Sequence, residues 1–131
     1  MLTGELHILQ TRNTPEVVIS PEGIIKIKGR ALMLNNTEIP ELMLNGFEEY
    51  LSDPPETTDV IIALEYLNSF SVTIIVSILE KIAHCILLPK KIVIRWYYEK
   101  DDENMLELGR YISEICDIPI KFVINNDVNT L

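Results

Sequence analysis

One apolar stretch near the middle of the chain constrains the fold more than any other feature. Asp59–Leu67 is nearly all apolar, which is typical of a strand buried on both faces of a sheet. Strands of that kind occur mostly in parallel sheets, whose neighbouring strands are joined by helical crossovers. The chain is therefore expected to be an α/β protein.

The segments before this run predict an opening hairpin. Glu16–Ser20 and Ile24–Gly29 have strand-like patterns, and the turn residues 21–23 lie between them. Glu5–Leu9 is interpreted as a frayed strand or an arm. Residues 31–39 have no clear period and are predicted to be a loop.

A first helix is expected to follow this loop. Pro40 suits its first turn, with Thr37 as a possible cap, and a Pro-Pro pair should end it near Ser52. Ser71–Leu87 is ambiguous, because its β-branched residues favour a strand while its length and apolar spacing favour a helix. We predict a helix, since two buried strands with a short gap would leave no crossover, and we expect Pro89 to end it.

The remaining segments complete an alternating pattern. Ile92–Tyr98 is predicted to be a strand, and an apolar stripe from Met105 predicts the last helix, in which Gly109 marks close packing on the sheet. Ile118–Ile124 is predicted to be an edge strand because it contains Pro119. The expected order is β-β-α-β-α-β-α-β, with a mostly parallel sheet and an N-terminal hairpin. The tail after Ile124 is expected to fray.

Charge and composition exclude several classes of partner. The formal net charge is −9, with 20 acidic against 11 basic residues, and no basic stripe is visible along the sequence. Nucleic acid and anionic membranes are therefore poor partners, and a basic protein surface is a better one. No signal peptide or membrane-spanning run is found, so a cytoplasmic location is expected.

The positions of the cysteines and histidines do not indicate a metal or cofactor site. Cys85 and Cys116 both lie in apolar segments, and we interpret them as buried free thiols. His7 and His84 have no metal-ligand spacing around them. No metal and no cofactor are expected.

The junction after the central strand is the best candidate site. Asn68-Ser69-Phe70-Ser71 leads from that strand into the next helix, where free backbone N–H groups favour an anion. A phosphate on a serine there would be stabilised by these groups. The competing interpretation is that Ser69 or Ser71 only caps the helix.

An enzymatic role is not predicted. Ser69 lacks the Gly-x-Ser-x-Gly motif of a nucleophile elbow, and neither histidine has a reason to lie beside it. Acidic residues such as Asp101 and Asp102 precede the last helix, where acids usually favour a helix start. Tyr97 and Tyr98 are expected in the core by default, with anchoring of a partner protein as the alternative.

The sequence resembles the SiaC-like biofilm-regulation phosphoproteins over about residues 14–123. The matching segments are Leu64–Ser71 and Trp96–Gly109, with Thr14-Pro15 and Gly29-Arg30. The resemblance implies one domain over residues 1–131, with a core of about 14–124. Its fold would be similar to the STAS domains of anti-sigma-factor antagonists.

The resemblance also implies a phosphorylation switch. The family junction reads roughly Tyr-Phe-Asn-Thr-Ser-Ser, and its phosphorylated threonine corresponds to Ser69; Ser71 is the second choice. Phe70 stands where the family has a serine. A kinase would add the phosphate, a PP2C-type phosphatase would remove it, and the unphosphorylated form would bind a diguanylate cyclase.

The expected function is thus that of a phospho-regulated protein-binding adaptor in a bacterial partner-switching pathway. The residues expected to bind the partner are Asn68, Phe70, Tyr97, Tyr98, Asp101 and Asp102. Two alternatives remain open: a small-molecule-binding STAS-like module, and a constitutive interaction domain that is not phosphorylated.

Overall fold

The protein contains one mixed sheet and three helices in the part of the chain that the structure describes. A computed structural model describes residues 4–35, 37–85, 90–125 and 131. The strands are β1 (Leu6–Ile8), β2 (Glu16–Ser20), β3 (Ile24–Ala31), β4 (Thr57–Leu67), β5 (Lys91–Tyr98) and β6 (Lys121–Ile124). The helices are α1 (Glu38–Ser52), α2 (Ser69–Cys85) and α3 (Glu103–Cys116).

The strands lie side by side in the order in which the chain makes them, from β1 to β6. The first three strands pair antiparallel. The pairs β3–β4, β4–β5 and β5–β6 are parallel. The predicted α/β class, with a mostly parallel sheet and an N-terminal hairpin, is therefore confirmed.

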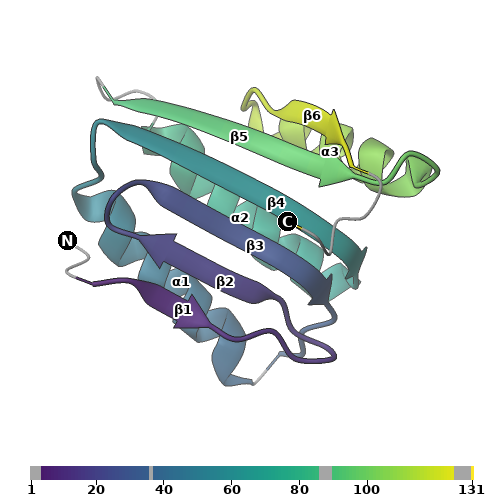
Figure 1. The fold of residues 1–131 in the computed structure, drawn as a ribbon, viewed down its shortest axis with the longest axis horizontal. Coiled ribbons are helices and arrows are strands. Elements are labelled where there is room, and N and C mark those ends of the chain that lie inside the picture. Colours follow the sequence, from purple (N-terminus) through teal and green to yellow (C-terminus); the bar gives the residue numbers. More distant parts are fainter. Residues whose placement is uncertain (1–3, 36, 86–89, 126–130) are drawn as a thin grey trace.

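The described helices all lie on one face of the sheet, behind it in the view of Figure 1. Each parallel connection moves one strand farther in the same direction, so right-handed crossovers place every helix on the same side. The opposite face, turned toward the viewer in Figure 1, carries no helix of the described residues. We call it the open face.

The open face overturns the expectation that β4 is buried on both faces. Val60, Ile62 and Leu64 point toward the helices and are at most 1% exposed. The alternate residues point to the open face, where Asp59 is exposed and Ile61 is half-buried. An apolar run indicates burial, but it does not show how many helical layers supply that burial.

The N-terminal strand changes the predicted element order. Leu6, His7 and Ile8 pair with β2 as an additional edge strand, so the order begins with three strands rather than two. Leu6 and Ile8 face the helices, and Ile8 is only 8% exposed. Two apolar residues are enough to hold a short edge strand, but too few to predict it with a clear period.

The ambiguous segment after β4 is helical, as predicted. α2 begins two residues earlier than expected, at Ser69. Its buried side includes Ile75, Leu79 and Ile82, which lie at helical spacing and pack into the core under the sheet. The expected end of this helix at Pro89 lies outside the described residues.

Close packing of α3 on the sheet explains Gly109. A Cβ atom at this position would lie 2.8 Å from side-chain atoms of both Trp96 and Phe122. The Trp96 indole N–H also donates a hydrogen bond of 3.1 Å to the Met105 carbonyl. The helix therefore rests directly on the indole ring, and the predicted role of Gly109 is confirmed.

The last strand is shorter than expected. β6 begins at Lys121 and forms the edge beyond β5, so the predicted edge position is confirmed. Ile118 and Pro119 precede it in a connecting segment, in which Ile118 is buried. The expected fraying of the tail falls largely on residues 126–130, which lie outside the described residues.

Candidate functional site

The site is built around the start of α2, where Asn68 acts as the cap. The Asn68 side-chain oxygen accepts a hydrogen bond of 2.9 Å from the backbone N–H of Ser71. Its amide nitrogen donates a 2.9 Å bond to the Met33 carbonyl, and its backbone N–H donates to Ala31. The hydrogen bonds of Asn68 therefore join the ends of β3 and β4 to the start of the helix.

This arrangement separates the two candidate serines. Ser71 is completely buried, and its hydroxyl accepts a 3.0 Å hydrogen bond from the Met33 backbone N–H. Ser69 is exposed, and its hydroxyl has no hydrogen-bond partner within the described part of the chain. Because Asn68 supplies the cap, neither serine does, and only Ser69 offers an accessible hydroxyl.

A groove lies on one side of Ser69, between α1 and α2. Its volume is about 560 Å³, and its walls include Pro40, Glu41, Leu44, Phe70 and Ile74. Phe70 is half-buried there and packs partly against the core. Apolar, acidic and amide side chains line the groove, and Phe70, one of them, directly follows Ser69 in the chain.

A second hollow lies at the other side of the strand end, between β4 and α3. Its volume is about 250 Å³, and residues from both elements line it, including Tyr66, Asp102 and Leu108. The sequence analysis predicted Asp102 near the site but missed Tyr66. Tyr66 is 53% exposed, which is a large exposed fraction for an aromatic side chain.

A break in the strand register turns two side chains of β4 toward Arg30. Gly29 pairs with Leu64, whereas Arg30 pairs with Tyr66, so Glu65 is passed over. The Arg30 guanidinium lies 5.2 Å from the centre of the Tyr66 ring and 3.7 Å from the Glu65 carboxylate. Bulges of this kind re-aim side chains near functional sites, and no local sequence pattern predicts them.

The remaining predicted residues are divided between three places. Tyr97 lies on the open face, and Tyr98 packs partly against the core on the helical side. The Asp102 side chain caps α3 by accepting a 3.1 Å hydrogen bond from the Met105 N–H. Asp101 is exposed in the turn before it. Asn68, Phe70 and the two aspartates therefore lie at the carboxyl ends of neighbouring strands, while Tyr97 is separate from them.

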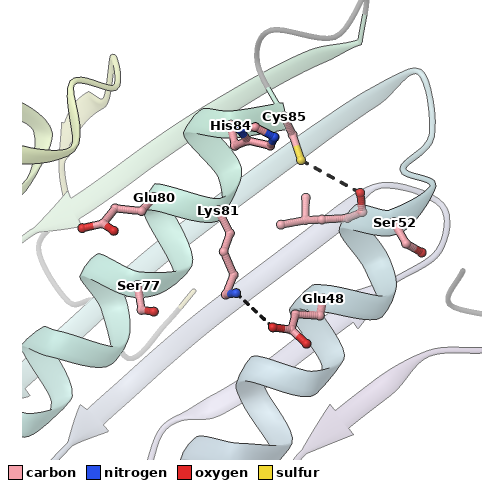
Figure 2. Close-up of a pocket in the computed structure, with 8 residues that line it drawn as sticks. Glu48, Ser52, Ser77, Glu80, Lys81, His84 and Cys85 are labelled. Atoms are coloured by element: carbon pink, nitrogen blue, oxygen red, sulfur yellow. Dashed lines mark hydrogen bonds and ion pairs between the residues drawn. The ribbon is translucent and has the colours of Figure 1, made fainter.

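A third groove lies between the C-terminal halves of α1 and α2 (Figure 2). Its volume is about 480 Å³. An ion pair of 3.0 Å between Lys81 and Glu48 crosses it, and the Cys85 thiol donates to the Leu51 carbonyl. His84 also lines this groove, at the opposite end of α2 from Ser69.

The thiols are in an unreactive setting. Cys85 and Cys116 are buried and free, as predicted. Burial raises the pKa of the Cys85 thiol, and burial followed by the charge of Glu80 raises the pKa of Cys116. A raised pKa keeps a thiol protonated, so neither is an activated nucleophile. The described residues contain no group of three or more His, Cys, Asp or Glu side chains suited to a metal ion.

None of the helices in the described ranges is both long and apolar enough to cross a membrane.

Two solved structures of similar fold come from Pseudomonas aeruginosa. The chain superposes on the crystal structure of apo-SiaC with a TM-score of 0.81 and 24% identity, covering 92% of this chain and 99% of that one. For the structure of the diguanylate cyclase SiaD in complex with its activator SiaC, the TM-score is 0.83 at 24% identity, with coverage of 92% and 99%. These similarities establish the fold.

Sequence comparison assigns the family. An uncharacterized protein of Pseudomonas aeruginosa (strain UCBPP-PA14) is 25% identical over 117 residues, which are 88% of this chain and 93% of that protein. The model of the SiaC family of regulatory phosphoproteins matches residues 8–125, which include the strands β2 to β6, all three described helices and the capped start of α2. The chain therefore belongs to the SiaC family of regulatory phosphoproteins.

Proposed function

We propose that this protein is a phospho-regulated adaptor whose switch is the hydroxyl of Ser69. The observation that carries the proposal is the division of roles at the start of α2: Asn68 caps the helix, Ser71 is buried, and Ser69 is exposed with an unused hydroxyl. A kinase can reach such a hydroxyl without unfolding the helix, and a phosphatase can reach its phosphate in the same way.

The electrostatics of the helix start support a stable phosphoserine. The first turn of a helix has backbone N–H groups without partners inside the helix, and the helix dipole favours negative charge there. A phosphate would add about −1.5 to −2 charges. It would do so one residue before Phe70, which lines the groove, so an apolar or acidic surface bound there would be repelled.

The unphosphorylated form is proposed to bind its partner over this edge. The surface is centred on Phe70 and extends to Asp101 and Asp102 at the end of the next strand. The partner class is a diguanylate cyclase, because SiaC of Pseudomonas aeruginosa is an activator seen in complex with the cyclase SiaD. A dedicated kinase and a PP2C-type phosphatase complete the proposed switch.

The first experiment is peptide mass spectrometry on the protein isolated from its own host, before and after phosphatase treatment. A phosphate on Ser69 that the phosphatase removes is the expected result. A phosphate on another residue would move the switch away from Ser69. The absence of any phosphate under several growth conditions would favour a constitutive adaptor or a ligand-binding module.

The second experiment measures partner binding directly. Ser69→Asp is expected to weaken binding to the host's diguanylate cyclase by about tenfold or more, equivalent to about 1.4 kcal/mol, whereas Ser69→Ala should bind as the wild type does. Ser52→Asp is the matched control, because Ser52 is an exposed serine at the far end of α1. Equal effects of both aspartates would contradict a local switch at Ser69.

A further inference from the structure

The open face of the sheet gathers positive charge from strands that are far apart in the sequence. We define the basic sheet face by residues whose side chains alternate with the buried ones: Lys26, Lys28, Arg30, Arg95 and Lys121. The strand register brings them together, because Lys26, Ile61, Arg95 and Lys121 lie in one row across β3, β4, β5 and β6. Neighbouring strands are about 4.8 Å apart, so these cations lie within one short segment of a bound chain.

The helical side has the opposite charge. Its acidic residues are Glu38, Glu41, Glu48, Glu49, Glu80, Glu103, Glu107 and Glu114. Within the three described helices, Lys81 is the only Lys residue and Arg110 is the only Arg residue. The formal net charge of −9 is therefore distributed unevenly between the two sides of the sheet. The net charge of the whole chain does not describe the charge of the open face.

The cations differ in how far they are neutralised. Carboxylates on the same face pair with three of them: Glu16 with Lys26 at 3.4 Å, Asp59 with Arg95 at 3.0 Å, and Glu65 with Arg30 at 3.7 Å. Lys28 lies opposite Glu16 in the register, but that carboxylate is turned toward His7 and Lys26. Lys28 is half-buried and has no acidic partner within the described residues.

Apolar residues lie at the centre of the face. Lys28, Ala63 and Tyr97 lie in one row, and Ala63 is completely buried although no described helix covers this side. The Lys26 ammonium donates a 3.3 Å hydrogen bond to the carbonyl oxygen of Leu131, and the C mark lies over β3 and β4 in Figure 1. A backbone carbonyl thus already meets a cation of this face.

We propose that the basic sheet face is a second interaction surface, which binds an extended acidic segment of a protein. The carboxylates of such a segment would pair with Lys28 and Lys121, while its apolar residues would pack on Ile61 and Tyr97. This surface is independent of Ser69, which lies beyond the carboxyl end of β4 at the start of α2.

The interspersed acids favour a peptide over a nucleic acid. Glu16, Asp59 and Glu65 lie among the cations, where they would oppose the evenly spaced phosphates of a nucleic acid strand. A peptide can place neutral residues opposite these carboxylates and acids only opposite the cations. The overall negative charge also repels a polyanion during its approach.

The test uses the full chain and a fluorescein-labelled peptide of alternating glutamate and valine, with fluorescence anisotropy as the readout. Lys28→Glu is expected to weaken binding by about tenfold, because it replaces a cation with a carboxylate that repels the glutamates of the peptide. Lys28→Gln should give a smaller loss, and it replaces Lys28→Glu if that variant fails to fold. Arg110→Glu, an exposed charge reversal on α3, should bind as the wild type does.

Three outcomes would overturn the proposal. Binding that is absent, or unchanged in both Lys28 variants, removes the surface. Equal losses in Lys28→Glu and Arg110→Glu mean that the peptide senses only net charge. Tighter binding of a labelled oligouridylate than of the peptide, with the same dependence on Lys28, makes the face a nucleic acid site. Amide chemical-shift changes confined to β3, β4, β5 and β6 would support the peptide site.

Discussion

At the scale of single residues, the start of α2 is organised by an amide rather than by a hydroxyl. The competing interpretation placed the cap on Ser69 or Ser71, although both Asn and Ser can cap a helix. The structure assigns the cap to Asn68, which also binds Met33 in the segment after β3. Local sequence could not choose between them, since the deciding contact comes from a residue far away in the chain.

Gly109 gives a prediction at the same scale. Gly109→Ala would gain about 1 kcal/mol in helix propensity, but the added methyl group would meet Trp96 and Phe122 at 2.8 Å. Both neighbours are aromatic rings packed in or against the core, so overpacking should prevail, with a net loss of about 1–2 kcal/mol. Urea unfolding measures the difference.

Glu107→Ala is the control for that measurement, since Glu107 is exposed on the same helix. Its effect should stay within about 0.5 kcal/mol. If Gly109→Ala were as stable as the wild type or more so, α3 would have room to move away from the indole ring. The direct contact described above would then not constrain the helix.

At the scale of elements, the acidic turn before α3 contains one structural aspartate and one free one. The sequence placed Asp101 and Asp102 together as partner-binding residues. In the structure, Asp102 has a structural role because its carboxylate accepts the Met105 N–H, whereas Asp101 is exposed. The sequence alone cannot distinguish the roles of two adjacent aspartates, because the backbone conformation of the turn decides which side chain faces the helix.

Asp102→Ala is therefore expected to destabilise the protein by about 1 kcal/mol through loss of the cap. Asp101→Ala should leave stability within about 0.5 kcal/mol of the wild type, so any loss of partner binding in that variant reports contact rather than unfolding. Thermal unfolding followed by circular dichroism compares the pair. Equal destabilisation of the two variants would show that the cap contributes nothing.

At the scale of the whole molecule, most elements could be predicted from the sequence, but their arrangement on two faces could not. Alternating apolar and basic residues identify β3, and helical spacing identifies α3. The covered face depends instead on the direction in which successive crossovers move. The basic sheet face was missed for the same reason, because Lys28 and Lys121 lie far apart in the chain and only strand pairing brings them onto one face of the sheet.

An ionised carboxylate in this sheet makes the stability of the fold depend on pH. The Glu16 carboxylate on β2 binds His7 on β1 and Lys26 on β3, so it joins the first three strands. The hydrogen bond with His7 is the main cause that lowers the pKa of Glu16 from its ordinary value of 4.5. A lowered folded-state pKa stabilises the fold above pH 4.5, and this contribution is lost as the pH falls through the folded-state pKa.

Glu16→Gln should therefore be less stable than the wild type at neutral pH, by less than about 1 kcal/mol for a partly exposed pair. The difference should shrink toward zero at a second, acidic pH below the folded-state pKa, where the wild-type carboxylate is protonated. Urea unfolding at both pH values measures it, with Glu107→Gln as an exposed control. A difference that stays constant with pH would mean that Glu16 acts through packing rather than charge.

The order of strands in the sheet also bears on synthesis at the ribosome. Each parallel strand pairs with the strand translated before it, from β3 to β6, so no position has to be kept vacant for a later segment to fill. The sheet can grow at a single edge while elongation continues, with β1 to β3 as the first paired unit. Besides the fixed outer edge of β1, a nascent chain then exposes a single growing edge, which limits the surface available for pairing with a neighbouring nascent chain.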